Sequence, residues 1–381
     1  MQMEQFRTSL TAWLLRKTAG AAVRRVGESS IAITTDVGVT RQENQDRVAV
    51  LKGADPNGRR YFVIALCDGM GGMADGAICG ATALAGFLAT FAENHSSALA
   101  LSERLRYAAY EANRIVFDIY RSRGGATLSA ILLHEPGKLY WVNVGDSRIY
   151  RKTLNEMEQL TVDDTLEGQL PHGGSFGARN QLLQFIGVGP DLEVHIGMLE
   201  YQDADQVLLS SDGLHGLPKD FLAEILANSP DLGVGIKRLV DIARWRGGHD
   251  NASGAVLSPL EAMKQLALGE GEPSVLEFWD PYGELHMVSV RQVKVVERPS
   301  SERDGKEPPV AEGSRGLSPP PAAKQPRTRK QRDPNAPKKD RAVKVPKATK
   351  QAAQVQTESG AIPEDAEKPQ LIIEFQNNEK K

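Results

Sequence analysis

The sequence predicts an α+β fold built on antiparallel sheets. Strand-like segments occur in runs, and helical segments are inserted between these runs in pairs, whereas a doubly wound parallel sheet would alternate the two one for one. The glycine fingerprints of Rossmann and P-loop folds are absent from the sequence. With 381 residues, of which 40% are hydrophobic, the chain is long enough to bury a core.

Local patterns justify the individual elements. Apolar runs on either side of the turn-rich ADPNG predict a hairpin. Downstream, apolar residues spaced i, i+3 and i+4 predict two long helices, and later apolar runs predict further strands. Pro218 suits the first turn of a helix, and Gly247 and Gly248 suit a helix end. The predicted strands are 47–53, 60–67, 128–134, 138–145, 147–152 and 205–211, and the predicted helices are 77–94, 97–123, one that begins at Pro218, and 233–248.

Charge and composition divide the chain into segments. Residues 297–381 carry a net charge of +5, and residues 1–296 a net charge of −8. Proline and serine become frequent after Pro299 and apolar periodicity is lost, which predicts a tail unable to fold. The expected organisation is an amphipathic N-terminal segment (1–27), a folded domain (28–258), an appendage with a β-hairpin (259–297) and a disordered, basic tail (298–381).

Cysteine usage and hydropathy favour the cytoplasm. Cys67 and Cys79 have the spacing of neither a disulfide framework nor a zinc site, which favours a reducing compartment. No apolar stretch reaches the roughly 20 residues that cross a bilayer, so we expect no membrane span. The basic segment 6–25 is amphipathic and is interpreted as a helix packed on the domain; a membrane or partner role stays open.

Acidic residues stand at the ends of five separate predicted strands, the fifth of which is NASGAVL (251–257). A single aspartate there is usually a turn former, but five carboxylates brought together would repel one another unless cations neutralised them. Oxygen ligands without clustered Cys or His favour Mg²⁺ or Mn²⁺ over zinc. The sequence therefore predicts a metal site built from Asp46, Asp68, Asp146, Asp212 and Asp250.

Six motifs, in order, carry a family resemblance. They resemble those of the metal-dependent type 2C Ser/Thr protein phosphatases in their bacterial form, over residues 28–258. The resemblance implies an α-β-β-α sandwich, two packed antiparallel sheets flanked by pairs of helices, with two Mg²⁺ or Mn²⁺ ions at one edge. The motifs are TTDVGVTRQENQD (34–46), LCDGMGG (66–72), GGATLSAILL (124–133), WVNVGDSRIY (141–150), LLSSDGLHG (208–216) and GGHDNASGAVL (247–257).

The resemblance implies specific metal ligands. Asp68 would bridge both ions, and Gly69 would offer its carbonyl oxygen. Asp212 and Asp250 would complete the shell of one ion, and Asp46 would hold the second ion through water. A glycine beside the bridging aspartate fits this role because bare backbone lets a carbonyl approach a metal.

Two further residues are implied to be catalytic. Arg41 matches the family's phosphate-binding arginine, whose planar fork suits two phosphate oxygens. Asp146 matches a position that, with Asp212, binds a weaker third ion in bacterial members. Taken alone, Arg41 could be a surface arginine and Asp146 a turn aspartate stabilised by Ser147 and Arg148.

The expected function is hydrolysis of phosphoserine and phosphothreonine in proteins. A hydroxide held between the two metal ions would attack phosphorus in line, which would reverse the action of a cognate Ser/Thr kinase. The alternative is a catalytically impaired phosphatase-like module that binds phosphoproteins or serves as a scaffold. Retention of all five acids and Arg41 favours the enzyme.

The sequence departs from the family pattern in three places. Met73 and Ala77 replace the usual histidine and glutamate. The glycine-threonine-threonine before the central strand is reduced to GGATLSA. The flap segment EGQLPHGGSFGARN is short. These changes bear on flap conformation and substrate choice. The general acid is unidentified, because the scattered histidines are interpreted as structural; they are His134, His172, His195, His215 and His249.

The tail carries two distinct features. Its basic stretch 324–350 is either a solvated linker or a contact for a polyanion, that is, nucleic acid or an acidic protein surface. The terminal LIIEF could add a strand to a partner's sheet edge.

Overall fold

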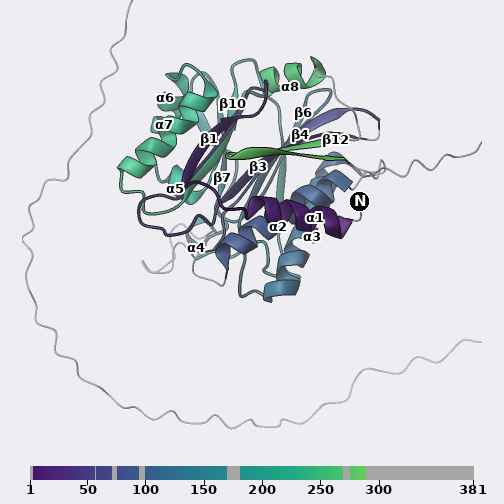
Figure 1. The fold of residues 1–381 in the computed structure, drawn as a ribbon. Coiled ribbons are helices and arrows are strands. Elements are labelled where there is room, and N and C mark those ends of the chain that lie inside the picture. Colours follow the sequence, from purple (N-terminus) through teal and green to yellow (C-terminus); the bar gives the residue numbers. More distant parts are fainter. Residues whose placement is uncertain are drawn as a thin grey trace, which may run out of the picture. The chain divides into compact units, whose positions relative to one another are not determined.

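Two antiparallel sheets pack face to face in the computed structural model, with helices on the outer face of each sheet (Figure 1). The structure describes residues 3–55, 57–70, 75–93, 99–169, 181–268 and 275–288. All of these belong to one unit, residues 1–298. The predicted α+β sandwich is therefore confirmed for the described part of the chain. The predicted tail and its LIIEF segment lie outside it.

Each sheet is antiparallel throughout the pairings that define it. Sheet A contains, in spatial order, β1 (Ala21–Arg25), β2 (Ile31–Asp36), β11 (Ala252–Leu257), β10 (Gln206–Ser210), β7 (Arg148–Lys152) and β8 (Met157–Gln159). Sheet B contains β13 (Gly283–Val288), β12 (Val275–Asp280), β3 (Arg47–Ala54), β4 (Arg60–Cys67), β5 (Leu128–His134), β6 (Lys138–Val144) and β9 (His195–Leu199).

Strand β4 shows how the sequence specifies its layer. Phe62, Ile64 and Leu66 pack between the two sheets, whereas Tyr61 and Val63 pack under the helices on the other face. Successive side chains of a strand point to opposite faces, and both faces of this strand are covered. The strand is therefore apolar throughout rather than alternating.

Helices cover both outer faces of the sandwich. Sheet B is covered by α1 (Met3–Leu14), α2 (Gly76–Glu93) and α3 (Leu101–Tyr120), and sheet A by α5 (Asp212–His215), α6 (Lys219–Ala227) and α7 (Leu232–Trp245) (Figure 1). Two further helices are α4 (Leu166–Gln169) and α8 (Pro259–Leu268). Helix α2 is long and apolar enough to cross a membrane, but 89% of it is buried inside the domain.

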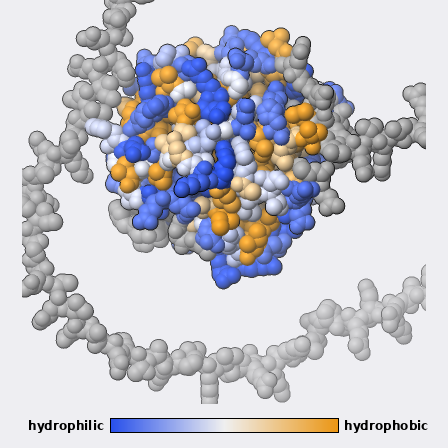
Figure 2. All heavy atoms as spheres, in the orientation of Figure 1, coloured by the Kyte–Doolittle hydropathy of each residue, from blue (hydrophilic) through white to orange (hydrophobic). Residues whose placement is uncertain are grey.

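The surface has the mixed character of a folded domain. Figure 2 shows apolar side chains on this face as separate groups among polar ones. The large apolar side chains of the described residues lie mainly in the three buried clusters, one between the sheets and one under each helical layer. Isolated exposed apolar residues are normal on a soluble fold.

The structure corrects the prediction for the N-terminal segment. The expected helix over 6–25 ends at Leu14, and Ala21–Arg25 forms strand β1 instead. Pairing with β2 satisfies the backbone of these residues, and this long-range gain overrides a local helical pattern. The helix does pack on the domain, with Phe6, Leu10 and Leu14 buried. Pro218 lies one residue before α6 rather than in its first turn.

Candidate active site

Five aspartates meet at one end of the sandwich. In sheet B, Asp46 precedes β3, Asp68 follows the adjacent β4, and Asp146 follows β6. In sheet A, Asp212 follows β10 and Asp250 precedes the adjacent β11. Antiparallel neighbours bring the end of one strand beside the start of the next. The two sheets thus direct carboxylates from both layers toward the same edge.

A cleft of about 740 Å³ opens at this edge. Asp46 does not line it, because this residue is only 3% exposed. The other six residues that the sequence singled out all line the cleft: Arg41, Asp68, Gly69, Asp146, Asp212 and Asp250. The structure therefore brings the predicted site residues together.

Burial and mutual repulsion raise the pKa values of the clustered carboxyl groups. Burial, followed by the charge of Asp46, raises the pKa of Asp68 well above its usual range. Burial and the charge of Asp250 raise the pKa of Asp212 to about 7, although its carboxyl group faces the solvent of the cleft. Burial and Asp163 raise the pKa of Asp146 to about 6. The acids of the cluster therefore repel one another.

Only one of the two carboxylate oxygens of Asp46 has a hydrogen-bond partner. Its Oδ2 accepts a hydrogen bond from Ser211 Oγ at 2.8 Å, whereas its Oδ1 is buried without a hydrogen-bond partner. Burial raises the pKa of this carboxyl group. Leaving a buried polar atom unpartnered is costly, so Oδ1 has the character of a ligand atom.

Arg41 contacts the cluster directly. Its Nη2 lies 2.7 Å from Asp250 Oδ2, and both side chains are partly exposed at the cleft. The hydrogen bond to Asp250 and the charges of Asp212 and Asp68 raise the pKa of Arg41. The guanidinium therefore stays charged and partly neutralises the acids.

Steric contacts explain why a glycine follows Asp68. A Cβ on Gly69 would lie 2.1 Å from the carbonyl oxygen of Gly76 and 2.9 Å from that of Gln45. The Gly69 amide donates to the Gln45 carbonyl at 3.2 Å. Only glycine allows this close backbone packing, which ties the Asp68 loop to the segment that carries Asp46.

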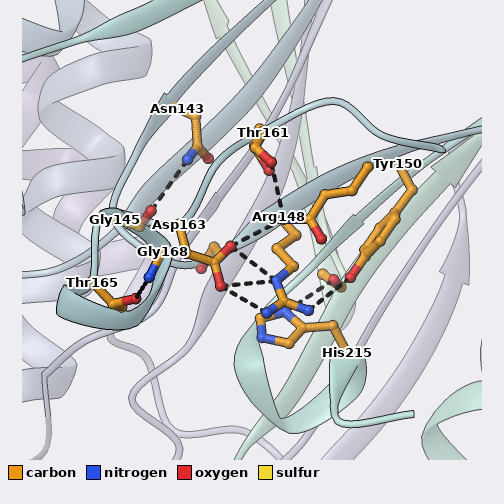
Figure 3. A network of polar contacts seen from close by, with 12 residues as sticks. Asn143, Gly145, Arg148, Tyr150, Thr161, Asp163, Thr165, Gly168 and His215 are labelled. Carbon is orange, nitrogen blue, oxygen red and sulfur yellow. Dashed lines mark hydrogen bonds and ion pairs between the residues drawn. The ribbon is translucent and has the colours of Figure 1, made fainter. Parts of the chain in front are cut away.

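A polar network supports the Asp146 side of the cleft (Figure 3). Arg148 binds Asp163 through both Nε and Nη2, at distances from 2.7 to 3.1 Å, and Nη1 donates to Tyr150 Oη at 3.2 Å. His215 lies beside the guanidinium (Figure 3); burial and Arg148 lower its pKa to about 3. Arg148 therefore pairs with Asp163, not with Asp146.

The carboxylates are not drawn together around a common point. Among the described residues, no group of three Asp, Glu, His or Cys side chains is close enough to hold a metal ion as it stands. Asp250 is turned to Arg41 and Asp46 to Ser211. The assignment of metal ligands stays a prediction.

Comparisons with known proteins identify the family. No protein-family model matches the sequence. The crystal structure of a PPM Ser-Thr phosphatase from Mycobacterium smegmatis is 32% identical, with a TM-score of 0.51 over 60% of this chain and 97% of that one. The chain belongs to the type 2C (PPM) family of Ser/Thr protein phosphatases.

Further relatives support this family assignment. The Ser/Thr phosphatase of Streptococcus agalactiae is 28% identical, with a TM-score of 0.53 over 59% of this chain and 97% of that one. A Streptococcus pyogenes protein named as a type 2C protein phosphatase is 27% identical over 241 residues, which are 60% of this chain and 96% of the relative. The predicted family is confirmed.

Two supporting residues of this type 2C site were missed by sequence reasoning. Thr127 Oγ1 accepts from the Asp68 amide at 2.9 Å, and the Thr127 amide donates back to the Asp68 carbonyl at 2.8 Å. Asn251 Oδ1 accepts from the Gln45 amide at 2.8 Å, and Asn251 Nδ2 donates to the Val37 carbonyl at 2.9 Å. Both lie inside quoted motifs, but their partners are distant in sequence.

The departures from the family pattern are only partly described. Ala77 is buried in the first turn of α2. Thr127 of the reduced GGATLSA motif still anchors the Asp68 loop. Met73 and the greater part of the flap segment, residues 170–180, lie outside the described residues.

The histidines hold different positions. His134 is buried beside Asp55, and His195 Nε2 lies 2.9 Å from Asp164 Oδ1. His215 lines the active-site cleft, which the sequence interpretation did not anticipate. Because its pKa is low, His215 is neutral near pH 7 and contributes shape and hydrogen bonding rather than charge. His172 lies outside the described residues.

Proposed function

We propose that this phosphatase hydrolyses phosphoserine and phosphothreonine in proteins with two divalent metal ions, Mn²⁺ or Mg²⁺, held by the clustered aspartates. The observation that carries the proposal is the convergence of five aspartates from two sheets on one edge of the sandwich, where four of them line one cleft. Three of them have pKa values raised by burial and by one another's charge. Such a cluster is costly for a domain that does not bind cations.

The residues in and beside the cleft fit hard divalent cations. Asp46 supplies a buried oxygen atom without a partner. Gly69 has no room for a side chain, so its backbone is bare at the cleft. Carboxylate and carbonyl oxygens are the ligands that Mg²⁺ and Mn²⁺ prefer. Binding would require Asp250 to turn from Arg41 toward the ion.

Each acid has a proposed place. Asp68 would contact both ions. One ion would be completed by the carbonyl of Gly69 and the carboxylates of Asp212 and Asp250. Asp46 would hold the other ion. When bound, two such ions supply an activated water for attack on phosphorus and neutralise the charge that develops on the phosphate oxygens.

Two residues would act around the metal pair. Arg41, once released by Asp250, would bind two phosphate oxygens of the substrate through its planar fork. Asp146, whose pKa is about 6, would hold a weaker third ion together with Asp212. Arg148 and Asp163 would fix the wall beside Asp146.

The alternative is a catalytically impaired module that binds phosphoproteins. It is not favoured, because a module that only binds phosphate needs Arg41 but not a cluster of mutually repelling carboxylates.

The proposed partners are phosphorylated proteins and a cognate Ser/Thr kinase, and the proposed location is the cytoplasm. The basic tail is proposed to contact nucleic acid or an acidic protein.

A direct assay tests the proposed function. Purified full chain is incubated with a phosphothreonine peptide and with p-nitrophenyl phosphate, in the presence of Mn²⁺, Mg²⁺ or excess chelator. We expect phosphate release with either metal and none with chelator. Phosphate release that persists in chelator would contradict the metal-dependent mechanism, and no release under any condition would favour the binding module.

Arg41→Ala should chiefly raise KM for the phosphopeptide. Loss of a charge-assisted hydrogen bond, worth about 1.5–3 kcal/mol, predicts a rise of roughly ten- to a hundredfold. Mn²⁺ should bind at least as tightly, because Arg41 competes for Asp250. Arg25→Ala, which removes an exposed arginine paired with Asp231, is the control. Weaker Mn²⁺ binding by Arg41→Ala would place Arg41 in the metal shell instead.

Asp212→Asn should stabilise the metal-free protein at alkaline pH. The pKa of Asp212 is about 7 in the folded state and about 3.9 unfolded, so its ionisation opposes folding progressively as pH rises from about 4 to 7. His215, with a folded pKa of about 3, acts in the opposite sense over part of this range, so the difference between variant and wild type is the useful quantity.

Urea unfolding in chelator measures that difference. We expect the free energy of unfolding of Asp212→Asn, minus that of wild type, to grow from pH 4 to pH 7 and to be level above. Added Mn²⁺ should stabilise the wild type far more than the variant. A difference independent of pH would show that Asp212 is not repelled by its neighbours.

A further inference from the structure

We propose that α1 and the β12–β13 hairpin form one clamp that positions the Asp46 carboxylate through Arg47. The clamp is defined as residues 3–20 and 275–288. The inference rests on the proposed function, in which Asp46 holds one of the two metal ions. Arg47 and Asp280 are then positioning residues, since neither is proposed to touch metal or substrate.

The apolar half of the clamp joins the two ends of the domain. Phe6 of α1 packs edge-on against Phe278 of β12, with ring centroids 5.9 Å apart. Phe6, Leu10 and Phe278 are buried in the cluster beneath α2. Figure 1 shows α1 lying beside β12. Segments some 270 residues apart in sequence therefore dock as a unit.

The polar half of the clamp is a bidentate ion pair between Arg16 and Asp280. Arg16 Nη1 and Nη2 lie 2.7 and 2.8 Å from the two oxygens of Asp280. The Asp280 side chain is only 6% exposed, and its Oδ1 also accepts from the amides of Tyr282 and Gly283 in the hairpin turn. Bidentate arginine–carboxylate pairs are strong and geometrically specific. The end of α1 is thus fixed to the hairpin turn.

Arg47 links the clamp to the metal loop. Its Nε donates to the carbonyl of Leu14, the last residue of α1, at 2.9 Å. Its Nη1 donates to the carbonyls of Asn44 and Asp46, each at 2.7 Å. One guanidinium therefore spans from the clamp to the backbone of Asp46 itself. A lysine has no planar fork and could not make these contacts together.

A cavity beside Asp46 makes the Arg47 hydrogen bonds important for the position of the Asp46 loop. About 380 Å³ of open space lies between residues 14–20, 42–48 and 280–282, and Asp46 and Arg47 both line it. On this side the Asp46 loop does not rest on close-packed side chains. It is held there by the Arg47 hydrogen bonds and by Asn44 Nδ2, which donates to Thr35 Oγ1 at 2.7 Å, while Ser211 holds the carboxylate from the other side.

Contacts that orient a metal ligand without touching the ion tune the affinity for the metal. Partners that orient a ligand typically change affinity by about 10- to 100-fold when they are removed. The clamp should therefore affect chiefly the ion that Asp46 holds. The ion proposed to rest on Gly69, Asp212 and Asp250 should be much less sensitive.

Three variants of the full chain separate positioning from stability. Arg47→Lys removes the fork but keeps the charge, and Asp280→Asn weakens the Arg16 pair while it retains an oxygen for the turn. Glu277→Gln is the matched control, because it breaks another ion pair of the same hairpin, with Lys52 at 2.9 Å, away from the metal loop. Mn²⁺ binding is measured by isothermal titration calorimetry, and thermal unfolding is measured in chelator.

We expect Arg47→Lys to raise the Kd of one of the two Mn²⁺ ions about tenfold or more and to leave that of the other nearly unchanged. Asp280→Asn should raise it less, and Glu277→Gln should not change it. The kcat for p-nitrophenyl phosphate should recover at saturating Mn²⁺. A purely structural role would instead lower the Tm and kcat without changing either Kd.

The outcomes distinguish the clamp from the proposed function. If the wild type binds two Mn²⁺ ions and both clamp variants match Glu277→Gln in affinity, the clamp is wrong and the proposed function stands. If the wild type binds no Mn²⁺, the proposed function fails and the clamp fails with it. Should Arg47→Lys not fold, Asp280→Asn against Glu277→Gln decides the question.

Discussion

Asp68→Asn should lower the rate of phosphothreonine hydrolysis at saturating Mn²⁺ by on the order of a thousandfold or more, because metal-held nucleophiles supply several kcal/mol of the rate enhancement. Asp68 lies at the centre of the cluster, where the charges of Asp46, Asp212, Asp146 and Asp250 all act on it. A neutral amide occupies the same space but cannot neutralise two cations. The measurement is kcat for a phosphothreonine peptide across a Mn²⁺ titration.

The same substitution should not unfold the protein. The pKa of Asp68 is well above its usual range, so asparagine resembles the form that the metal-free protein prefers. We therefore expect the Tm in chelator to be unchanged or higher. Asp205→Asn, which removes a buried aspartate that pairs with Arg151 just before β10, is the control and should retain activity. Full activity of Asp68→Asn would overturn its bridging role.

Gly69→Ala should destabilise the fold and inactivate the enzyme together. The new Cβ would lie 2.1 Å from the Gly76 oxygen and 2.6 Å from the Gly76 carbonyl carbon. Both are backbone atoms that no rotamer change can move. Overpacking of this kind typically costs about 1–3 kcal/mol and can cost more. The shift would also displace the adjacent Asp68, so kcat should fall beyond what the loss of folded protein explains.

Gly216→Ala is the matched control for that prediction. Gly216 also lines the cleft, has ordinary helical backbone angles, and its nearest neighbour would be 3.7 Å from a new Cβ. Urea unfolding should show a change within about 0.5 kcal/mol, as for surface substitutions generally. Equal destabilisation by both alanines would mean that the contact with Gly76 does not constrain the loop.

Sequence reasoning succeeded where the feature is local. An aspartate at the end of an apolar run can be placed at a sheet edge from the run alone, and antiparallel order then brings Asp68 beside Asp46. The same logic applies to Asp212 and Asp250. The five predicted aspartate ligands therefore meet at one edge of the sandwich, although no two of these aspartates are close in the sequence.

Sequence reasoning failed where contacts between residues distant in the sequence determine the structure. The strand at Ala21–Arg25 exists because β2 offers an edge to pair with, which a helical pattern cannot reveal. Thr127 and Asn251 act through backbone groups from other strands. The pairing of Arg148 with Asp163, rather than Asp146, depends on how residues 159–163 lie against β7. No spacing in the sequence encodes these contacts.

The most direct test of the two-metal centre is the number of Mn²⁺ ions that the full chain binds at equilibrium near pH 8. Calorimetric titration of metal-free protein should give two ions per chain for the wild type and fewer than two for Asp68→Asn. Absence of binding by the wild type, or two ions retained with unchanged affinity in Asp68→Asn, would contradict a metal centre built on the five aspartates.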